Sequence, residues 1–362
     1  MTCTTVSSAA PHEITMTPLA SPREFCVNTR TAGDDPLASF RNSRPLPSTI
    51  LSQFVFGGRA YHQPARDLLS PIQWPVTWVH GDPCSGQNLG GTQYYCVANA
   101  PVRTICLDGQ IVGRVYEDEH AQYCHLGGLL PTDVHATREA QTRDCFERVE
   151  AALNQIGMDF SHVVRTWLYL KRLLDWYREF NVVRNAFFDE RHVFDGLVPA
   201  STGIGGGNPA NAALTVAALA IRPKTDQLRI FAVPSPLQCP ATEYRSAFSR
   251  AIEVDRPGLR QLYISGTASI APDGKSVHQG NPIRQIDLSM AVAAAILHSR
   301  RMDWSNTTRL VAYFKHMSYL PHFTAWCQQH HLTDLPVVYS HADVCRDDLL
   351  FEVELDAATP NP

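Results

Sequence analysis

The sequence has no long apolar run, no excess of one charge and no apolar leader. Its longest apolar candidate, Ala212 to Ile221, falls well short of the roughly 18 residues that a membrane-spanning helix needs. The net charge is −4 and the isoelectric point is near 6.4, so we expect no basic surface for nucleic acid or for an anionic membrane. The start of the chain lacks the apolar segment of a secretory signal, and we therefore predict a cytoplasmic protein.

The cysteines and histidines form no metal-binding pattern. The ten cysteines are scattered without any C-x-x-C spacing, which argues against a zinc site or a disulfide framework and predicts free thiols. The histidines between 316 and 341 match no zinc spacing. No P-loop, G-x-S-x-G or H-E-x-x-H motif is present, so nothing indicates an NTPase, a serine hydrolase or a zincin. The sequence thus implies no metal and no cofactor.

Two segments of the chain repeat each other. Residues 158–171 and 302–315 share methionine, aspartate, serine, arginine, tyrosine and lysine at the same relative positions. Around each segment, alternating and helical apolar patterns predict a β-β-α-β-α-β unit with both helices on one face of a small mixed sheet. The other face of such a sheet must be buried, so we expect an α+β fold in which the repeats pack on each other as a barrel.

These patterns divide the chain into four parts. Residues 1–45 are rich in Ser, Thr, Pro and Ala and predict a mobile N-terminal arm. Residues 46–115 contain short apolar runs broken by Gly, Pro and Asn, which predicts an N-terminal β-rich segment. The first repeat is expected at 116–225 and the second at 240–357.

The final strands of the two repeats differ in charge. Residues 214–219 of the first repeat are uncharged, whereas residues 350–355 of the second include Glu352 and Glu354. Side chains two apart on a strand point to the same face, so the two carboxylates would lie together and repel. Such repulsion raises the pKa of at least one carboxyl group, which could then hold a proton near neutral pH. Two solvated glutamates on an exposed face are the alternative.

Several short motifs resemble the RidA (YjgF) family, whose repeats have a chorismate mutase-like topology. The motifs are Leu-Gly-Gly-Leu-Leu-Pro (126–131), Asn-Ala-Phe-Phe (185–188), Phe-Ser-Arg-Ala (248–251), Ser-Gly-Thr-Ala-Ser (265–269) and the closing Phe-Glu-Val-Glu (351–354). The resemblance implies tandem repeats that pack as a pseudo-oligomer, with sites between neighbours and a glutamate at Glu352. That family also uses an arginine in the loop before the last strand. The matching loop here, 335–339, has none, which argues against imine hydrolysis.

The tandem arrangement looks more specifically like that of the chorismatases. This resemblance covers roughly residues 100 to 357, and its most specific part is Asp-Val-Cys-Arg-Asp-Asp-Leu-Leu-Phe-Glu (343–352). Chorismatases need no cofactor and cleave chorismate to pyruvate plus either a dihydroxycyclohexadienoate or a hydroxybenzoate. The resemblance implies that Glu352 is the acid that protonates the enolpyruvyl methylene. It leaves Glu354 without a role.

Cys345 is a second candidate for catalysis. Among chorismatases, a cysteine at this place accompanies the variants that aromatise the ring and release hydroxybenzoate. Its thiol could relay a proton if the neighbouring Arg346 lowers its pKa. A small, buried, apolar residue is the alternative.

Arg250 is the first candidate for binding the substrate carboxylates. It shares a strand face with Phe248 and Ile252, and a planar guanidinium group suits a carboxylate. Tyr339 and Arg346 are further candidates, because both lie near the acidic strand.

A glycine-rich loop, 201–207, is expected to face this site from the first repeat, because glycines let backbone N–H groups approach an anion. A purely conformational role is the alternative. The candidate residues are Thr202, Gly203, Gly205 and Gly206 in the loop, and Gly266, Thr267 and Ala268 on the opposing wall.

We therefore predict an enzyme that binds chorismate and releases pyruvate with 3-hydroxybenzoate, with or without 4-hydroxybenzoate. The first alternative is a hydrolytic chorismatase that gives 3,4-dihydroxycyclohexa-1,5-diene carboxylate. A RidA-type enamine or imine deaminase and a non-catalytic metabolite-binding protein are the others. The sequence leaves open whether the chain is a monomer with internal pseudo-oligomeric packing or a homo-oligomer.

Overall fold

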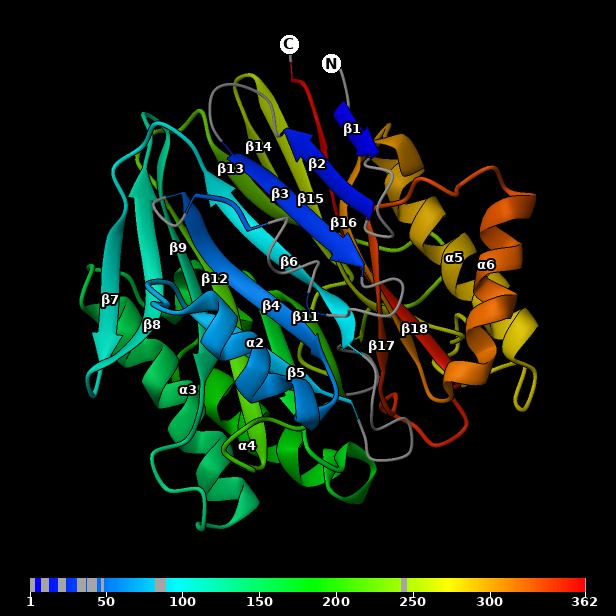
Figure 1. Cartoon of the computed structure of the whole chain (residues 1–362), viewed down its shortest axis with the longest axis horizontal. Helices are drawn as coiled ribbons and strands as arrows, with labels where there is room; N and C mark the ends of the chain where they lie inside the picture. Colours follow the sequence, from blue (N-terminus) through cyan, green and yellow to red (C-terminus); the bar gives the residue numbers. More distant parts are fainter. Residues whose placement is uncertain are drawn as a thin grey trace.

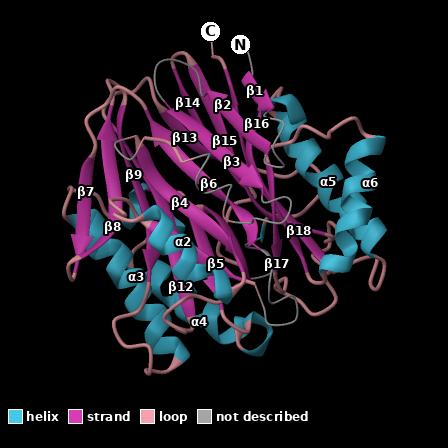
Figure 2. Ribbon diagram, viewed as in Figure 1, coloured by secondary structure: helices cyan, strands magenta, loops and turns pink. Residues whose placement is uncertain are grey.

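Three six-stranded sheets form the centre of the molecule (Figure 1). The computed structural model describes residues 4–7, 13–18, 24–30, 37, 44–46, 49–81, 89–241 and 246–361. Within this part of the chain the helices lie at the periphery and the strands at the centre, as Figure 2 shows. None of the described helices is long and apolar enough to cross a membrane.

Each sheet is built from one continuous stretch of the chain. The first contains β1 (Thr4–Ser7), β2 (Glu13–Pro18), β3 (Glu24–Arg30), β4 (Ile50–Gly57), β5 (Val76–His80) and β6 (Leu89–Val97), with α2 (His62–Leu69) between β4 and β5. The second contains β7 (Arg103–Leu107), β8 (Gln110–Glu117), β9 (Ala121–Leu129), β10 (Val163–Leu170), β11 (Ala200–Gly205) and β12 (Leu214–Pro223), with α3 (Arg138–Asn154) and α4 (Tyr177–Glu190). The third contains β13 (Arg229–Val233), β14 (Ala251–Arg256), β15 (Leu259–Ala268), β16 (Thr307–Phe314), β17 (Val337–His341) and β18 (Phe351–Thr359), with α5 (Pro282–Ser299) and α6 (Leu320–Gln329).

All three sheets have the same strand order. It is β1-β2-β3-β6-β4-β5 in the first, β7-β8-β9-β12-β10-β11 in the second and β13-β14-β15-β18-β16-β17 in the third. In each, the fourth and fifth strands of the sequence pair in parallel and the remaining pairs are antiparallel. The expected α+β fold with repeats packed as a barrel is therefore confirmed, and the sheet formed by the first part of the chain adds a third unit of the same topology.

The N-terminal part of the chain differs from the sequence-based expectation. Residues 24–30, expected to belong to a mobile arm, form β3 and pair along their whole length with β6. Cys26 and Val27 on this strand are buried. Cys26 faces the core shared with the second and third sheets, whereas Val27 packs on the other face of the first sheet in a cluster with α2. Residues 103–115, expected in a separate β-rich segment, form β7 and part of β8, which extend the second sheet by pairing with β9.

The repeated sequence signature has a local structural cause. Asp159 and Asp303 each cap a short turn before a central strand, where their carboxylates accept the backbone N–H of Ser161 at 2.9 Å and of Ser305 at 2.8 Å. These caps fix where β10 and β16 begin. The arginine and tyrosine that come next in each copy therefore start from the same register and point toward the common core of the three sheets.

The sheets meet around equivalent aromatic residues. Phe56, Tyr169 and Tyr313 are each the seventh residue of the fourth strand of their sheet. The ring of Phe56 lies 6.3 Å from that of Tyr169 and 6.4 Å from that of Tyr313, and the two tyrosine hydroxyl oxygens are 3.5 Å apart. This contact places the inner faces of all three sheets in one core, so polar side chains on those faces are removed from water.

Candidate active site

Strand β18 carries acidic side chains on its inner face. Glu352, Glu354 and Asp356 alternate along the strand and are 5%, 0% and 4% exposed. The intervening Val353 and Leu355 pack with the helices on the outer face. The expected pairing of the two glutamates on one face is confirmed, and the solvated alternative is wrong, because the face that carries them is the one enclosed by the other two sheets.

Glu354 is held in a fully buried ionic network. Nη2 of Arg165 and Nη2 of Arg309 each donate to one of its carboxylate oxygens at 2.7 Å, and Nε1 of Trp167 donates at 3.1 Å. Burial alone would raise the pKa of Glu354, but the two guanidinium groups outweigh burial and hold the pKa below its usual value. Glu354 is therefore ionised at neutral pH.

Glu352 has the opposite environment. Among the described residues, no side chain or backbone group donates a hydrogen bond to the Glu352 carboxyl group. Burial, and then the negative charge of Glu354, raise the pKa of Glu352 to about 8, although Arg165 and Arg250 act in the other direction. Two neighbouring carboxyl groups with diverging pKa values are typical of a pair in which one member carries a proton and the other a charge.

The Glu352 carboxyl group faces a cavity between the second and third sheets. The cavity has an open space of about 60 Å³, which is less than the few hundred Å³ that ligand pockets usually have. Side chains must therefore move when a ligand enters. The lining residues are Tyr177, Arg184, Ser201 and Gly203 from the unit of the second sheet, and Ser246, Phe248, Arg250, Gly266, Ala268, Ile270, Cys345, Arg346 and Glu352 from the unit of the third.

Two arginines on the cavity wall could bind an anionic ligand. Arg250 is 5% exposed, and its Nε and Nη2 atoms both donate to the backbone carbonyl of Cys239 at 3.0 Å. Arg184 is 1% exposed and donates from Nη2 to Asn181 Oδ1 at 2.6 Å. A dianionic ligand could use both guanidinium groups, since they line one enclosed space.

Cys345 lines the same cavity, but its thiol is not activated. Burial, and then the charge of Glu352, raise the pKa of the Cys345 thiol to about 12, while Arg346 only partly opposes them. The lowered pKa that a proton relay through this thiol would require is not found, because burial and then the charge of Glu352 outweigh Arg346. Arg346 is itself engaged: its Nη1 donates to the carbonyl of Gly274 at 2.8 Å.

The glycines near the cavity have two different roles. A methyl group on Gly266 would overlap Oε1 of Glu352, and one on Gly203 would lie 3.3 Å from the Tyr177 hydroxyl, so both leave room for the cavity. Gly205 and Gly206 do not line it. Their N–H groups donate to the carbonyls of Asp343 at 2.8 Å and Leu170 at 3.0 Å, which corrects the expectation that they are available to an anion.

Comparisons with known proteins show which sequences and folds the chain is similar to. The family model described as Endoribonuclease L-PSP matches residues 119–226. A chorismatase of Streptomyces rapamycinicus is 26% identical over 222 residues, which cover 54% of this chain and 64% of that protein. A 3-hydroxybenzoate synthase of Streptomyces hygroscopicus is 23% identical over 68% of this chain and 76% of that protein. A crystal structure of a chorismatase superposes with a TM-score of 0.70 at 20% identity, covering 94% of this chain and 99% of that one.

The chain is similar to chorismatases in sequence and in fold. The resemblance inferred from its motifs is thus confirmed, and so is the shared fold. The first of these relatives is matched over less than two thirds of its length, 64%.

Besides Gly205 and Gly206, three more of the expected binding residues lie outside the cavity. Thr202 is behind it, where its Oγ1 accepts from the N–H of Gly266 at 3.0 Å. Thr267 Oγ1 donates to the carbonyl of Ser265 at 2.9 Å. Tyr339 lies on the edge strand β17, next to the first sheet, and its hydroxyl accepts from Arg30 Nη1 at 2.8 Å. Proximity in the sequence to the acidic strand was misleading for Tyr339.

Sequence reasoning missed two polar cavity residues on α4, Tyr177 and Arg184. A signal for Arg184 was present. It falls on the same helical stripe as Phe180, Phe187 and Phe188, all of which are buried, and an arginine on an apolar stripe is uncommon unless it has a partner or a ligand. Tyr177 gave no such signal.

Proposed function

We propose that this protein cleaves chorismate at its enolpyruvyl ether and releases pyruvate. The observation that carries the proposal is the pair of carboxyl groups on β18: Glu352 has a pKa of about 8 and stands beside Glu354, whose pKa is lowered. Glu352 is therefore protonated at neutral pH and can act as a general acid. The names of its relatives, chorismatase and 3-hydroxybenzoate synthase, support the choice of substrate.

Arg184 and Arg250 would hold the substrate. Chorismate carries two carboxylates, and the cavity wall offers two buried guanidinium groups. In this arrangement the enolpyruvyl group lies against Glu352. Gly266 keeps this position open, because any larger residue would overlap the carboxyl group.

The chemical step is a proton transfer from the Glu352 carboxyl to the methylene carbon of the enol ether. The π electrons form the new C–H bond and leave an oxocarbenium ion, while Glu352 becomes a carboxylate. Because Glu354 remains negative, the site then has two anionic groups near the new cation, which stabilises it. Attack by an oxygen nucleophile on the cation leads to loss of pyruvate.

The nucleophile decides the second product. Water would give the dihydroxycyclohexadiene carboxylate, with one water consumed. Attack by the ring hydroxyl, followed by ring aromatisation, would give hydroxybenzoate and pyruvate without net consumption of water. We propose the second course, with 3-hydroxybenzoate as the product, because the protonated, neutral thiol of Cys345 lines the cavity beside Glu352. Replacing Cys345 by alanine should shift the product toward the diene while pyruvate release continues.

The proposal is tested with Glu352→Gln. This variant should bind chorismate but release pyruvate at least about a hundredfold more slowly, since general acid catalysis contributes about 10²–10⁴-fold. Thr215 occupies the position on β12 of the second sheet that Glu352 occupies on β18. Thr215→Val is therefore the matched control and should keep full activity. Normal pyruvate release by the glutamine variant would refute the assignment of the acid. Ammonia release from 2-aminoacrylate by the unaltered protein, without pyruvate from chorismate, would indicate a deaminase.

A further inference from the structure

The interface between the first and second sheets is built like the one that holds Glu352. At the Glu352 interface the N–H of Gly266 donates to Thr202 Oγ1 at 3.0 Å. At the other, the N–H of Gly128 donates to Thr77 Oγ1 at 2.9 Å. The two glycines occupy the same place on β15 and β9, and the two threonines the same place on β11 and β5.

At the interface between the first and second sheets, Thr215 occupies the position that Glu352 occupies at the interface between the second and third sheets. On β18, Glu352 pairs with Tyr313 of β16, and on β12, Thr215 pairs with Tyr169 of β10. Tyr169 and Tyr313 are equivalent residues of the repeat. Thr215 is 2% exposed, and its Oγ1 has no hydrogen-bond partner among the described residues. A buried hydroxyl without a partner is costly unless a ligand or water satisfies it.

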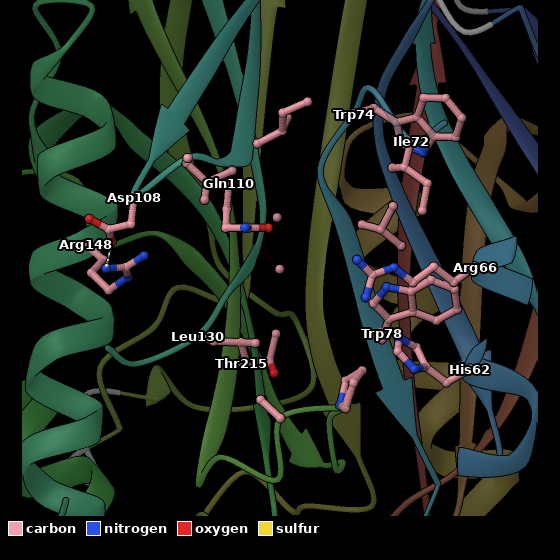
Figure 3. Close-up of a pocket in the computed structure, with 18 of the residues that line it drawn as sticks. His62, Arg66, Ile72, Trp74, Trp78, Asp108, Gln110, Leu130, Arg148 and Thr215 are labelled. Atoms are coloured by element: carbon pink, nitrogen blue, oxygen red, sulfur yellow. Dashed lines mark hydrogen bonds and ion pairs between the residues drawn. The ribbon is translucent and has the colours of Figure 1, made fainter. Parts of the chain in front are cut away.

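Thr215 faces a hollow of about 890 Å³, a size typical of small-molecule sites. Figure 3 shows its two walls. One wall comes from α2, β5 and the loop between them, and the other from the β7–β8 hairpin, β9, α3 and β12. The labelled residues are His62, Arg66, Ile72, Trp74 and Trp78 on the first wall, and Asp108, Gln110, Leu130, Arg148 and Thr215 on the second.

The two arginines of the hollow differ in their availability. Arg148 is neutralised by Asp108, whose carboxylate accepts from its Nη1 at 2.6 Å. Arg66 lies on the exposed side of α2, and Figure 3 shows its guanidinium group directed into the hollow beside Trp78. Within the described part of the chain, the Arg66 side chain makes no ion pair or hydrogen bond. The hollow therefore has one uncompensated positive charge next to an indole ring.

We propose that this hollow binds a planar ring carboxylate without converting it. The carboxylate pairs with Arg66 and the ring lies against Trp78. A polar substituent at the far end of the ring, such as a hydroxyl group, satisfies the buried Thr215 hydroxyl, and unsubstituted benzoate tests the Arg66 and Trp78 contacts alone. Threonine cannot supply a proton as a carboxyl group does, so the site binds and does not catalyse. This inference stands independently of the proposed function, because it uses none of the residues of the Glu352 cavity.

Sodium benzoate titrated into uniformly ¹⁵N-labelled protein tests the proposal. The indole N–H signal of Trp78, identified as the one that Trp78→Phe removes, should shift with saturating benzoate and should not shift with uncharged benzyl alcohol. Arg66→Gln should weaken benzoate binding at least about tenfold. Arg59→Gln removes an equal charge just before α2 but outside the hollow, and should have no such effect.

Binding must also be independent of the other cavity. The Trp78 shift should persist unchanged in Arg250→Gln. The proposal is overturned if benzoate leaves the Trp78 signal unmoved, if benzyl alcohol moves it equally, or if Arg66→Gln and Arg59→Gln affect benzoate binding to the same extent. Loss of the shift in Arg250→Gln alone would likewise overturn it, because the signal would then report on the Glu352 cavity.

Discussion

The two interfaces of the second sheet have the same framework and different chemistry. Both use a threonine that accepts from the N–H of a glycine, at Thr202 and Gly266 on one side and at Thr77 and Gly128 on the other. One interface closes around an acid, and the other opens into a hollow lined by indole rings. A shared arrangement of strands thus fixes where a site forms, whereas a few side chains decide what it does.

The difference between the interfaces extends beyond Glu352 itself. Glu354, which raises the pKa of Glu352, pairs with Val311 of β16, and the equivalent position on β12 is Ala217, which pairs with Trp167. The second sheet therefore lacks both the acid and the neighbouring charge that, after burial, raises the pKa of the acid.

The largest effect is expected from Glu354→Gln. It leaves Arg165 buried without its ion-pair partner and leaves Arg309 with only Asp356, whose Oδ2 is 3.9 Å from Nη1. Loss of one partner from a buried ion pair costs about 3–5 kcal/mol. Urea unfolding measures this loss. The matched control is Glu253→Gln: Glu253 is also fully buried, but its partner Arg300 is 30% exposed and can be solvated. Equal losses in the two variants would show that the central network has no special importance.

Alanine at the two equivalent glycines should separate activity from stability. At Gly266 the methyl group meets the end of the Glu352 side chain, so pyruvate release should fall at least about a hundredfold with little change in unfolding. At Gly128 the added methyl group would overlap the carbonyl oxygen of Val76, and the backbone has a φ of +63°. The stability of Gly128→Ala should therefore fall by about 1–3 kcal/mol. Equal losses of stability in Gly266→Ala and Gly128→Ala would contradict the different roles of the two glycines.

The pKa of Glu352 predicts a descending pH profile. Pyruvate release needs the protonated acid, so its rate should fall about tenfold per pH unit above about pH 8. In Glu352→Asp any residual activity should fall at a different pH, whereas in Thr215→Val the profile should be unchanged. A rate that is constant from about pH 7 to about pH 10 would contradict the role of Glu352 as the acid.

The same group links stability to pH. The folded-state pKa of about 8 lies above the ordinary value of 4.5, so between these two values the folded state holds a proton that the unfolded state has lost. The stabilisation from this group is full below about pH 4.5 and is lost as the pH rises through about 8. The free energy of unfolding should depend less on pH in this window in Glu352→Gln than in the unaltered protein.

The smallest effect is expected at the third interface, between the third and first sheets. Tyr339→Phe removes the hydroxyl that accepts from Arg30, which should cost about 1 kcal/mol of stability. Because Tyr339 does not line the Glu352 cavity, pyruvate release should stay unchanged. A raised KM for chorismate in this variant would restore Tyr339 as a substrate-binding residue.

The repeat signature predicted the second and third sheets, but not the first. Met-Asp-x-Ser followed by arginine and tyrosine marks β10 and β16 because the aspartate caps and the inward side chains recur together. In β4 the positions of the arginine and tyrosine are held by Ser52 and Phe56, and only one described helix, α2, accompanies the sheet. The first unit therefore has the same topology without the residues that made the other two recognisable.

Within the site, the sequence determined the features that depend on local geometry alone. The two-residue period of a strand places Glu352 and Glu354 on one face, and the lack of any charge on 214–219 shows that only one repeat carries the acids. The tertiary structure decided which face is enclosed and which of the two acids holds the proton. Arg165 and Arg309 come from different sheets, and both form ion pairs with Glu354 and not with Glu352. A pKa depends on burial and on charges close in space, and neither is fixed by spacing along the chain.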